Sequence, residues 1–159
     1  MGSQSKIKLA YIAGFLDGDG SLMLQLKKRK DGILKFRFMA TICFYQDTRH
    51  EKDLYWIQEV LGIGYISKRN DGMTELRING FSQVRNILAM LKPFIRFKSS
   101  QTQALIKACQ ILSSTKFKML NKSKLLKLVD YVLVIHSKNY VTKKKKTREE
   151  LLKILGLTP

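Results

Sequence analysis

The sequence is a strongly basic chain of 159 residues, in which 30 basic and 12 acidic side chains give a net charge of +18. This length suits a single domain, and a hydrophobic content of 45% permits a buried core. Solubility alone needs far less charge, so the excess indicates a polyanionic partner, most often a nucleic acid. Because no apolar run reaches the roughly 18 residues of a membrane span and the chain does not begin like a signal peptide, we expect an intracellular protein without a membrane partner.

The first predicted elements are an apolar helix at 7–21 and two β-hairpins, each of which precedes a further helix. Apolar side chains recur at helical spacing in the first segment and then alternate, which is the pattern of a strand. Turn sequences at 30–32 and 70–72 divide the hairpins. The helix after the first hairpin begins at the capping-box spacing of Thr48 and Glu51. The predicted strands cover 22–29, 35–46, 65–69 and 73–79, and the helices that follow the hairpins cover 48–61 and 82–92.

The order of these elements predicts an α+β fold with an α-ββα-ββα core. Such a core forms a four-stranded antiparallel DNA-binding sheet with helices on one face, followed by extra C-terminal helices. We expect one domain over 1–159, with its core at about 6–138 and a basic loop and terminal helix in 139–159. The C-terminal helices are predicted at 100–112, 124–137 and 147–155, the first and last behind capping-box pairs, Ser100 with Gln103 and Thr147 with Glu150.

One face of both hairpins carries basic and hydrogen-bonding side chains. Arg and Gln match the edges of guanine and adenine in the major groove, and Lys side chains suit phosphates. A single charged strand face is usually just solvated, but two such hairpins in a strongly basic chain favour contact with DNA. The run 143–146 is expected at phosphates, and a solvated loop or a nuclear-type basic patch are the alternatives for it. The residues predicted to contact DNA are Gln25, Lys27, Arg29, Lys35, Arg37, Ser67, Lys68, Arg69, Glu75, Arg77, Lys143 and Lys146.

The helix at 7–21 ends in two carboxylates, Asp17 and Asp19. The carboxyl end of a helix dipole is unfavourable for anions, so two acids there indicate a cation site, and oxygen ligands suit Mg²⁺ or Ca²⁺. A DGDGS string is also an ordinary turn sequence, and both interpretations stand on these residues alone. Gly14 and Gly18 are one helical turn apart, where missing side chains let another backbone come close.

The segment IAGFLDGDGS at 12–21 resembles the motif of LAGLIDADG homing endonucleases over ten positions. The resemblance to the single-motif branch extends over nearly the whole chain and implies a metal-dependent enzyme that cuts both strands of DNA. It implies that Asp19 and the backbone carbonyl of Gly18 bind metal, while Asp17 is more structural. It further matches Gln46 and Lys98 to residues that position or polarise water at the scissile phosphate. The family often has a basic residue where this chain has His50, next to Arg49.

One aspartate per chain is too few ligands for a self-contained two-metal site, and cutting two strands needs two sites. A single motif therefore implies a homodimer, whose first helices pack about a two-fold axis through Tyr11, Gly14, Phe15 and Gly18. Such symmetry predicts a pseudo-palindromic target. We expect Mg²⁺ as the cofactor, with Ca²⁺ or Mn²⁺ as substitutes, and double-stranded DNA and a second copy of the chain as partners, without a protein cofactor.

Two functions from other classes also fit parts of the sequence. A non-catalytic nucleic-acid binder on the same fold, such as an intron RNA maturase or a transcription regulator, explains the charge but would need none of Asp19, Gln46 and Lys98. A ribosomal-type RNA-binding protein leaves the apolar helix with its terminal aspartates unexplained. The resemblance further implies an intron-encoded protein, expected in the chloroplast or mitochondrion of an alga or fungus.

Overall fold

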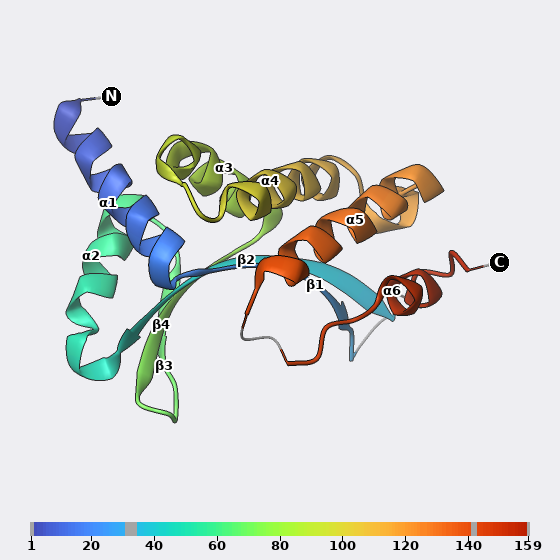
Figure 1. The fold of residues 1–159 in the computed structure, drawn as a ribbon, viewed down its shortest axis with the longest axis horizontal. Coiled ribbons are helices and arrows are strands. Elements are labelled where there is room, and N and C mark those ends of the chain that lie inside the picture. Colours follow the sequence, from blue (N-terminus) through green and yellow to red (C-terminus); the bar gives the residue numbers. More distant parts are fainter. Residues whose placement is uncertain (1, 31–34, 141–142, 159) are drawn as a thin grey trace.

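A four-stranded antiparallel sheet lies beneath a layer of helices (Figure 1). The computed structural model describes residues 2–30, 35–140 and 143–158. The predicted α+β class and the α-ββα-ββα order are confirmed, with the strands arranged as β1-β2-β4-β3. The strands are β1 (Ser21–Lys28), β2 (Phe36–Asp47), β3 (Tyr65–Lys68) and β4 (Met73–Asn79). The helices are α1 (Ser3–Asp19), α2 (Lys52–Leu61), α3 (Phe81–Leu91), α4 (Ser99–Ser114), α5 (Lys122–Lys138) and α6 (Arg148–Ile154).

Alternation along the strands gives the sheet a helix-facing side and an outer side, as the sequence predicts. The apolar side chains of β1, β2 and β4 face the helices and form one core with them. Burial of this apolar area is the main favourable contribution to folding, at roughly 25 cal/mol per Å². The helix-facing core residues of the sheet are Leu22, Leu24, Leu26, Phe38, Ala40, Ile42, Phe44, Leu76 and Ile78.

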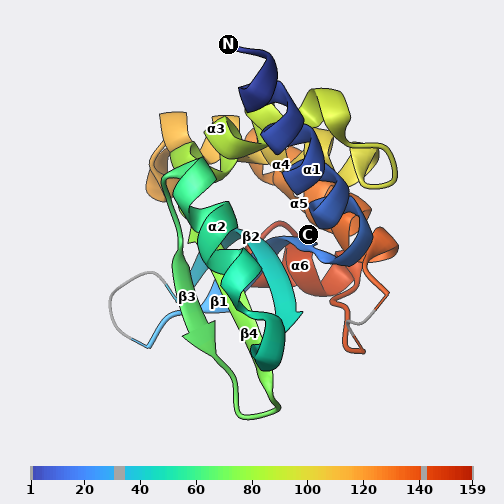
Figure 2. The same ribbon diagram turned by 90° about the vertical axis from the view of Figure 1, so that its left-hand side faces the viewer.

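Helix α1 is buried along one side only. Leu9, Ile12 and Leu16 lie in the core, whereas Tyr11 on the opposite side is 66% exposed. The helix begins at Ser3, four residues before the predicted start, without a side-chain cap. Figure 2 shows α1 and α2 side by side at one end of the molecule, where the rings of Tyr11 and Trp56 meet edge to face at 5.6 Å. An apolar helix with an exposed apolar side has surface available for a partner.

Two predicted capping boxes are wrong, and in the first of them both side chains have a tertiary partner. A short 3₁₀ turn, Thr48–His50, precedes α2, and Thr48 Oγ1 lies 3.0 Å from Thr74 Oγ1. Glu51 accepts a hydrogen bond from Thr74 Oγ1 at 2.8 Å instead of capping the helix.

The second wrong box is at the start of α4. That helix begins at Ser99 without a side-chain cap, so Ser100 and Gln103 do not form the expected pair. The box at Thr147 and Glu150 is confirmed, with both reciprocal hydrogen bonds present at the start of α6.

The outer side of the sheet is more enclosed than its polar pattern indicates. Thr41 and Cys43 alternate with the helix-facing residues of β2, and their side chains contact outer-side residues of β4. Both are nevertheless buried, because short side chains on a central strand are covered by longer neighbours. Residues 31 and 32 of the first predicted turn lie outside the described residues. Among the described helices, none is long and apolar enough to cross a membrane.

Candidate active site

The carboxyl end of α1 is fixed by Asp17, whose side chain is only 6% exposed. Its Oδ2 accepts hydrogen bonds from the backbone N–H groups of Arg96 at 2.6 Å and Phe97 at 2.9 Å. Its Oδ1 accepts one from the backbone N–H of Lys98 at 2.8 Å. These three donors lie just before α4, so one carboxylate joins two helices that are about 80 residues apart in the sequence.

Lys98 completes this connection. Its Nζ donates to the backbone carbonyl of Asp17 at 2.5 Å, which places an ammonium group at the end of α1. Burial lowers the pKa of Lys98, and the negative charges of Asp17 and Asp19 oppose that shift. The structure therefore brings together Asp17, Asp19 and Lys98, of which the sequence predicts Asp19 and Lys98 as site residues.

The last carbonyls of a helix have no intrahelical donors, and at α1 two of them have other partners. The carbonyl of Leu16 accepts the N–H of Gly20, and that of Asp17 accepts Lys98 Nζ. The carbonyl of Gly18 and the exposed side chain of Asp19 follow at the end of the helix. Both are oxygen donors of the kind that hard divalent cations such as Mg²⁺ prefer.

One chain supplies too few ligands for a complete metal site. In the described residues no three His, Cys, Asp or Glu side chains gather where they could hold a metal ion. The donor set at the end of α1 thus fits a divalent cation chemically but is incomplete in number, which agrees with a site shared between two copies of the chain.

Gln46 lies near the end of β2 with its side-chain oxygen occupied. Gln46 Oε1 accepts the backbone N–H of Asp47 at 2.9 Å, which leaves the amide nitrogen as the end that can donate to another group. His50 is exposed on the following turn. Its neighbour Arg49 is held in a two-point pair with Asp47, at 2.9 Å for both contacts, and this pair lowers the pKa of Asp47. Of the two basic residues here, Arg49 is therefore already paired within the chain.

An apolar groove runs between α1 and α2. It has a volume of about 500 Å³. Five of the side chains that line it are apolar or aromatic residues from the two helices, and Lys8, Gln46 and Asp53 line it as well. The apolar and aromatic residues of the lining are Ile7, Tyr11, Phe15, Trp56 and Ile57.

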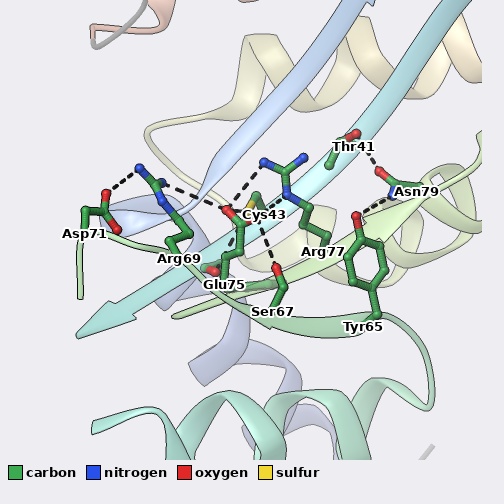
Figure 3. A network of polar contacts seen from close by, with 10 residues as sticks. Thr41, Cys43, Tyr65, Ser67, Arg69, Asp71, Glu75, Arg77 and Asn79 are labelled. Carbon is green, nitrogen blue, oxygen red and sulfur yellow. Dashed lines mark hydrogen bonds and ion pairs between the residues drawn. The ribbon is translucent and has the colours of Figure 1, made fainter. Parts of the chain in front are cut away.

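Glu75 organises the outer side of the sheet (Figure 3). It is 7% exposed, and its carboxylate accepts hydrogen bonds from Arg77 Nε at 2.6 Å and Ser67 Oγ at 3.3 Å. Cys43 Sγ lies 3.8 Å from Oε2, and Arg69 Nη1 lies 4.0 Å from the same oxygen. The pair with Glu75 raises the pKa of Arg77. Glu75, itself predicted to contact DNA, thus holds three other predicted residues, Ser67, Arg69 and Arg77.

The sequence analysis missed several members of this surface. Arg69 also pairs with Asp71 in the β3–β4 turn at 2.6 Å. Asn79 accepts a hydrogen bond from Thr41 at 2.7 Å and donates one to the Tyr65 hydroxyl at 3.3 Å. The spacing of Glu75, Arg77 and Asn79 along one face of a strand is a signal that could have revealed a polar row.

The remaining residues predicted to contact DNA are not all on one surface. Gln25 and Lys27 alternate with the buried leucines of β1 and so lie on its outer side. Lys68 lies on the helix side instead, because its Nζ pairs with Glu51 at 3.0 Å. Its role at phosphates stays a prediction. The other predicted DNA-contacting residues are all exposed, and they are Arg29, Lys35, Arg37, Lys143 and Lys146.

A sheet under a layer of helices, with a glycine-bearing helix that ends in aspartates, defines the class of LAGLIDADG endonucleases. Residues 12–112 match the sequence profile of that family, and the chain belongs to it. With one motif it falls in the single-motif branch of homing endonucleases, which are DNA endonucleases, and the predicted resemblance is confirmed.

Two curated relatives are DNA endonucleases from algae. The chain is 33% identical over 111 residues to I-CvuI of Chlorella vulgaris, which covers 70% of this chain and 69% of that protein. It is 28% identical over 147 residues to I-CreI of Chlamydomonas reinhardtii, which covers 92% of this chain and 88% of that protein.

Solved structures share the fold across almost the whole chain. The structure of I-CvuI in complex with its target in the presence of Ca superposes with a TM-score of 0.86 at 28% identity, covering 99% of this chain and 100% of that one. The archaeal intron-encoded homing endonuclease I-Vdi141I, complexed with DNA, has a TM-score of 0.79 at 21% identity, covering 94% and 95%. At that identity the second likeness supports the fold alone.

Proposed function

We propose that this chain is a homodimeric homing endonuclease that makes double-strand breaks in a long, pseudo-palindromic DNA target by Mg²⁺-dependent phosphodiester hydrolysis. One observation carries the proposal: the exposed apolar side of α1 ends at Asp19, beside Lys98. A second copy packed on that side brings two Asp19 carboxylates and two Gly18 carbonyls to one place. The chain alone supplies too few ligands, and this arrangement supplies the rest.

The chain's own residues have separate roles in this proposal. Asp19 and the Gly18 carbonyl hold the metal ion, which supplies charge neutralisation at the phosphate and activation of water when it is bound. Lys98, held at the Asp17 carbonyl, places a positive charge next to the phosphoryl oxygens. Gln46 orients water through its amide nitrogen, since its oxygen is already bonded. His50 is the basic residue of this turn in the proposal, because its neighbour Arg49 is already paired with Asp47.

The outer side of the sheet is the DNA-binding surface in this proposal. Glu75 holds the side chains of Arg69 and Arg77 on this surface. Two sheets related by a two-fold axis would cover two half-sites. The complex of I-CvuI with its target supports this use of the fold. The algal relatives support an organellar, intron-encoded origin.

The test begins with finding a target. Duplexes that bind the wild-type protein in Ca²⁺ are selected from a random pool, cloned into a plasmid and exposed to the protein in Mg²⁺. We expect the wild-type protein to convert the plasmid to its linear form. We also expect the selected duplexes to contain an inverted repeat. Asp19→Asn should bind the same duplex within about threefold of wild type and leave the plasmid uncut.

The control is Glu59→Gln, which makes the same carboxylate-to-amide change on the exposed surface of α2 and should cut normally. Tight, selective binding by wild type without any cleavage in Mg²⁺ or Mn²⁺ would refute the nuclease and support a DNA-binding protein without catalysis. Cleavage by Asp19→Asn at the wild-type rate would place the metal elsewhere.

A further inference from the structure

A small cationic pocket lies at the edge of the sheet, beside β1. It has a volume of about 180 Å³ and lies between the outer side of β1, the end of α5 and the segment that leads into α6. Figure 1 shows this segment passing beside β1 on its way to α6. The polar side chains that define the pocket are Gln25, Lys27, His136, Asn139, Lys144 and Lys146.

The pocket concentrates positive charge without a compensating acid. None of the described residues that line it is acidic, and its three lysines take no part in the ion pairs found among the described residues. Like charges in one pocket repel one another, so an anion that enters it relieves this repulsion. A phosphate group suits three ammonium groups because it accepts several charge-assisted hydrogen bonds.

The wall of the pocket is fixed by hydrogen bonds. Asn139 Nδ2 donates to the backbone carbonyl of Leu22 at 3.1 Å, on the free edge of β1. Gln101 Nε2 lies 3.5 Å from Asn139 Oδ1 and holds the amide from the other side. These bonds place the end of α5 against the strand and set the position of His136 one turn earlier.

His136 has a hydrogen-bonding atom left without a partner. Its Nδ1 is buried and bonds to none of the described atoms. Burial lowers the pKa of His136, the backbone carbonyl of Leu24 raises it, and Lys145 and Lys146 lower it again. The imidazole is therefore neutral near pH 7 in the free protein. Its place in the last turn of α5 nevertheless favours a positive charge, because helix carbonyls point toward it.

Within the part of the chain that the structure describes, no acid lines the pocket to hold a proton on this ring. Lys27 faces the pocket from β1, and lysines face it from the segment 144–146. On the side of α6, the Glu150 carboxylate accepts the backbone N–H of Thr147 and closes the capping box. Negative charge at His136 has to come from a ligand.

We propose that this pocket binds a phosphate of the DNA backbone and that His136 takes up a proton as the phosphate enters. The proton comes from solvent and binds the lone pair of Nδ1. The inference rests on the proposed function for the source of the phosphate, because Gln25 and Lys27, on the outer side of β1 assigned to DNA, line the pocket.

Proton uptake makes binding depend on pH with a definite sign. The complex holds one more proton than the free protein between the two pKa values of His136, so affinity rises as pH falls through that window. Above the pKa of the complex the contribution is lost. A rise of one pKa unit on binding corresponds to about a tenfold tighter complex at the lower end of the window.

The chain has two histidines, so proton NMR can follow the ring of His136 directly. Its signals are assigned by their loss in His136→Asn, and the ring is titrated in the free protein, in inorganic phosphate and in a mixed-sequence duplex of about three helical turns. We expect the duplex to raise the pKa of His136 by about one unit. The double variant Lys144→Gln and Lys146→Gln should abolish the rise. The matched control, Lys107→Gln with Lys127→Gln, removes the same charge from α4 and α5 and should preserve it.

Each other result overturns the inference. If the duplex binds and the pKa of His136 stays unchanged, the pocket does not contact the DNA. If inorganic phosphate raises the pKa of His136 and a bound duplex does not, the pocket takes a free phosphate instead. If no duplex binds at all, the proposed function is refuted as well. If the protein cleaves DNA but duplex binding leaves the pKa of His136 unchanged, only this inference is refuted.

Discussion

At the scale of single residues, two aspartates two positions apart have opposite surroundings. Asp17 is buried and accepts three backbone N–H groups, while Asp19 is exposed at the end of the helix. Replacing Asp17 with Asn removes the negative charge and one acceptor oxygen from these donors. Hydrogen bonds to a charged group contribute about 1.5–3 kcal/mol each, so Asp17→Asn should destabilise the fold by about 3 kcal/mol.

Asp19→Asn is the matched control, because it makes the same chemical change without removing any described hydrogen bond. Its unfolding midpoint in urea, measured without metal, should equal that of wild type. Equal midpoints for wild type and Asp17→Asn would contradict the bracing role of Asp17. The two variants thus separate an acid that holds α1 to the start of α4 from an acid that is available to a ligand.

The contrast between these residues also marks the limit of sequence analysis at this scale. The resemblance ranks Asp19 above Asp17 as a metal ligand, and the DGDGS string alone cannot do so. The partners of Asp17 are at 96–98, and nothing in the spacing of the sequence brings those N–H groups to it. The unpartnered Nδ1 of His136 depends in the same way on how α5 meets β1.

At the scale of elements, periodicity predicted the helices and strands because burial on one face determines them. Leu22, Leu24 and Leu26 are buried in alternation, as that argument requires. The capping box at Thr48 and Glu51 failed because a capping pair is a local motif that competes with tertiary partners. Thr48 and Glu51 both find Thr74 on β4. The box at Thr147 formed at the start of an exposed helix, where no such partner competes.

The outer sheet yields a prediction at this scale, because Glu75 links side chains from three strands. Glu75→Gln keeps the shape but removes the charge that orients Arg69 and Arg77. We expect a loss of about 1–2 kcal/mol in the free energy of unfolding, at the lower end for a charge pair because Arg77 is partly exposed. Bound duplexes selected by the variant should show relaxed base preference at the positions these arginines contact, since bidentate recognition needs a fixed guanidinium.

Two measurements check this prediction, urea unfolding and selection from a random duplex pool. Glu59→Gln, on the exposed surface of α2, removes the same charge and should change neither result. An unchanged sequence preference in Glu75→Gln, with its stability lowered as expected, would mean that Glu75 supports the sheet without presenting its arginines to DNA.

At the scale of the whole molecule, the exposed side of α1 determines whether one chain is enough. Tyr11, Gly14 and Gly18 lie on that side, next to the groove between α1 and α2. A Cβ added at Gly14 or Gly18 meets no heavy atom within 4 Å in the single chain. The space directly beside both glycines is therefore open in the isolated chain, so we expect the effect of a larger side chain there to come from a partner.

Gly18→Leu should break the dimer and leave the protomer folded. The two-fold axis places the new side chain on both helices, so a cost of about 1–3 kcal/mol for each would weaken association by roughly 30-fold to 20,000-fold. Sedimentation at micromolar concentration should show monomer with an unchanged circular dichroism spectrum, and cleavage should be lost because each Asp19 is left without its counterpart. Gln110→Leu, which adds the same side chain on the exposed surface of α4, should remain dimeric and active. If Gly18→Leu stays dimeric and cuts at the wild-type rate, the two copies meet elsewhere, and the shared metal site at the ends of the α1 helices has to be abandoned.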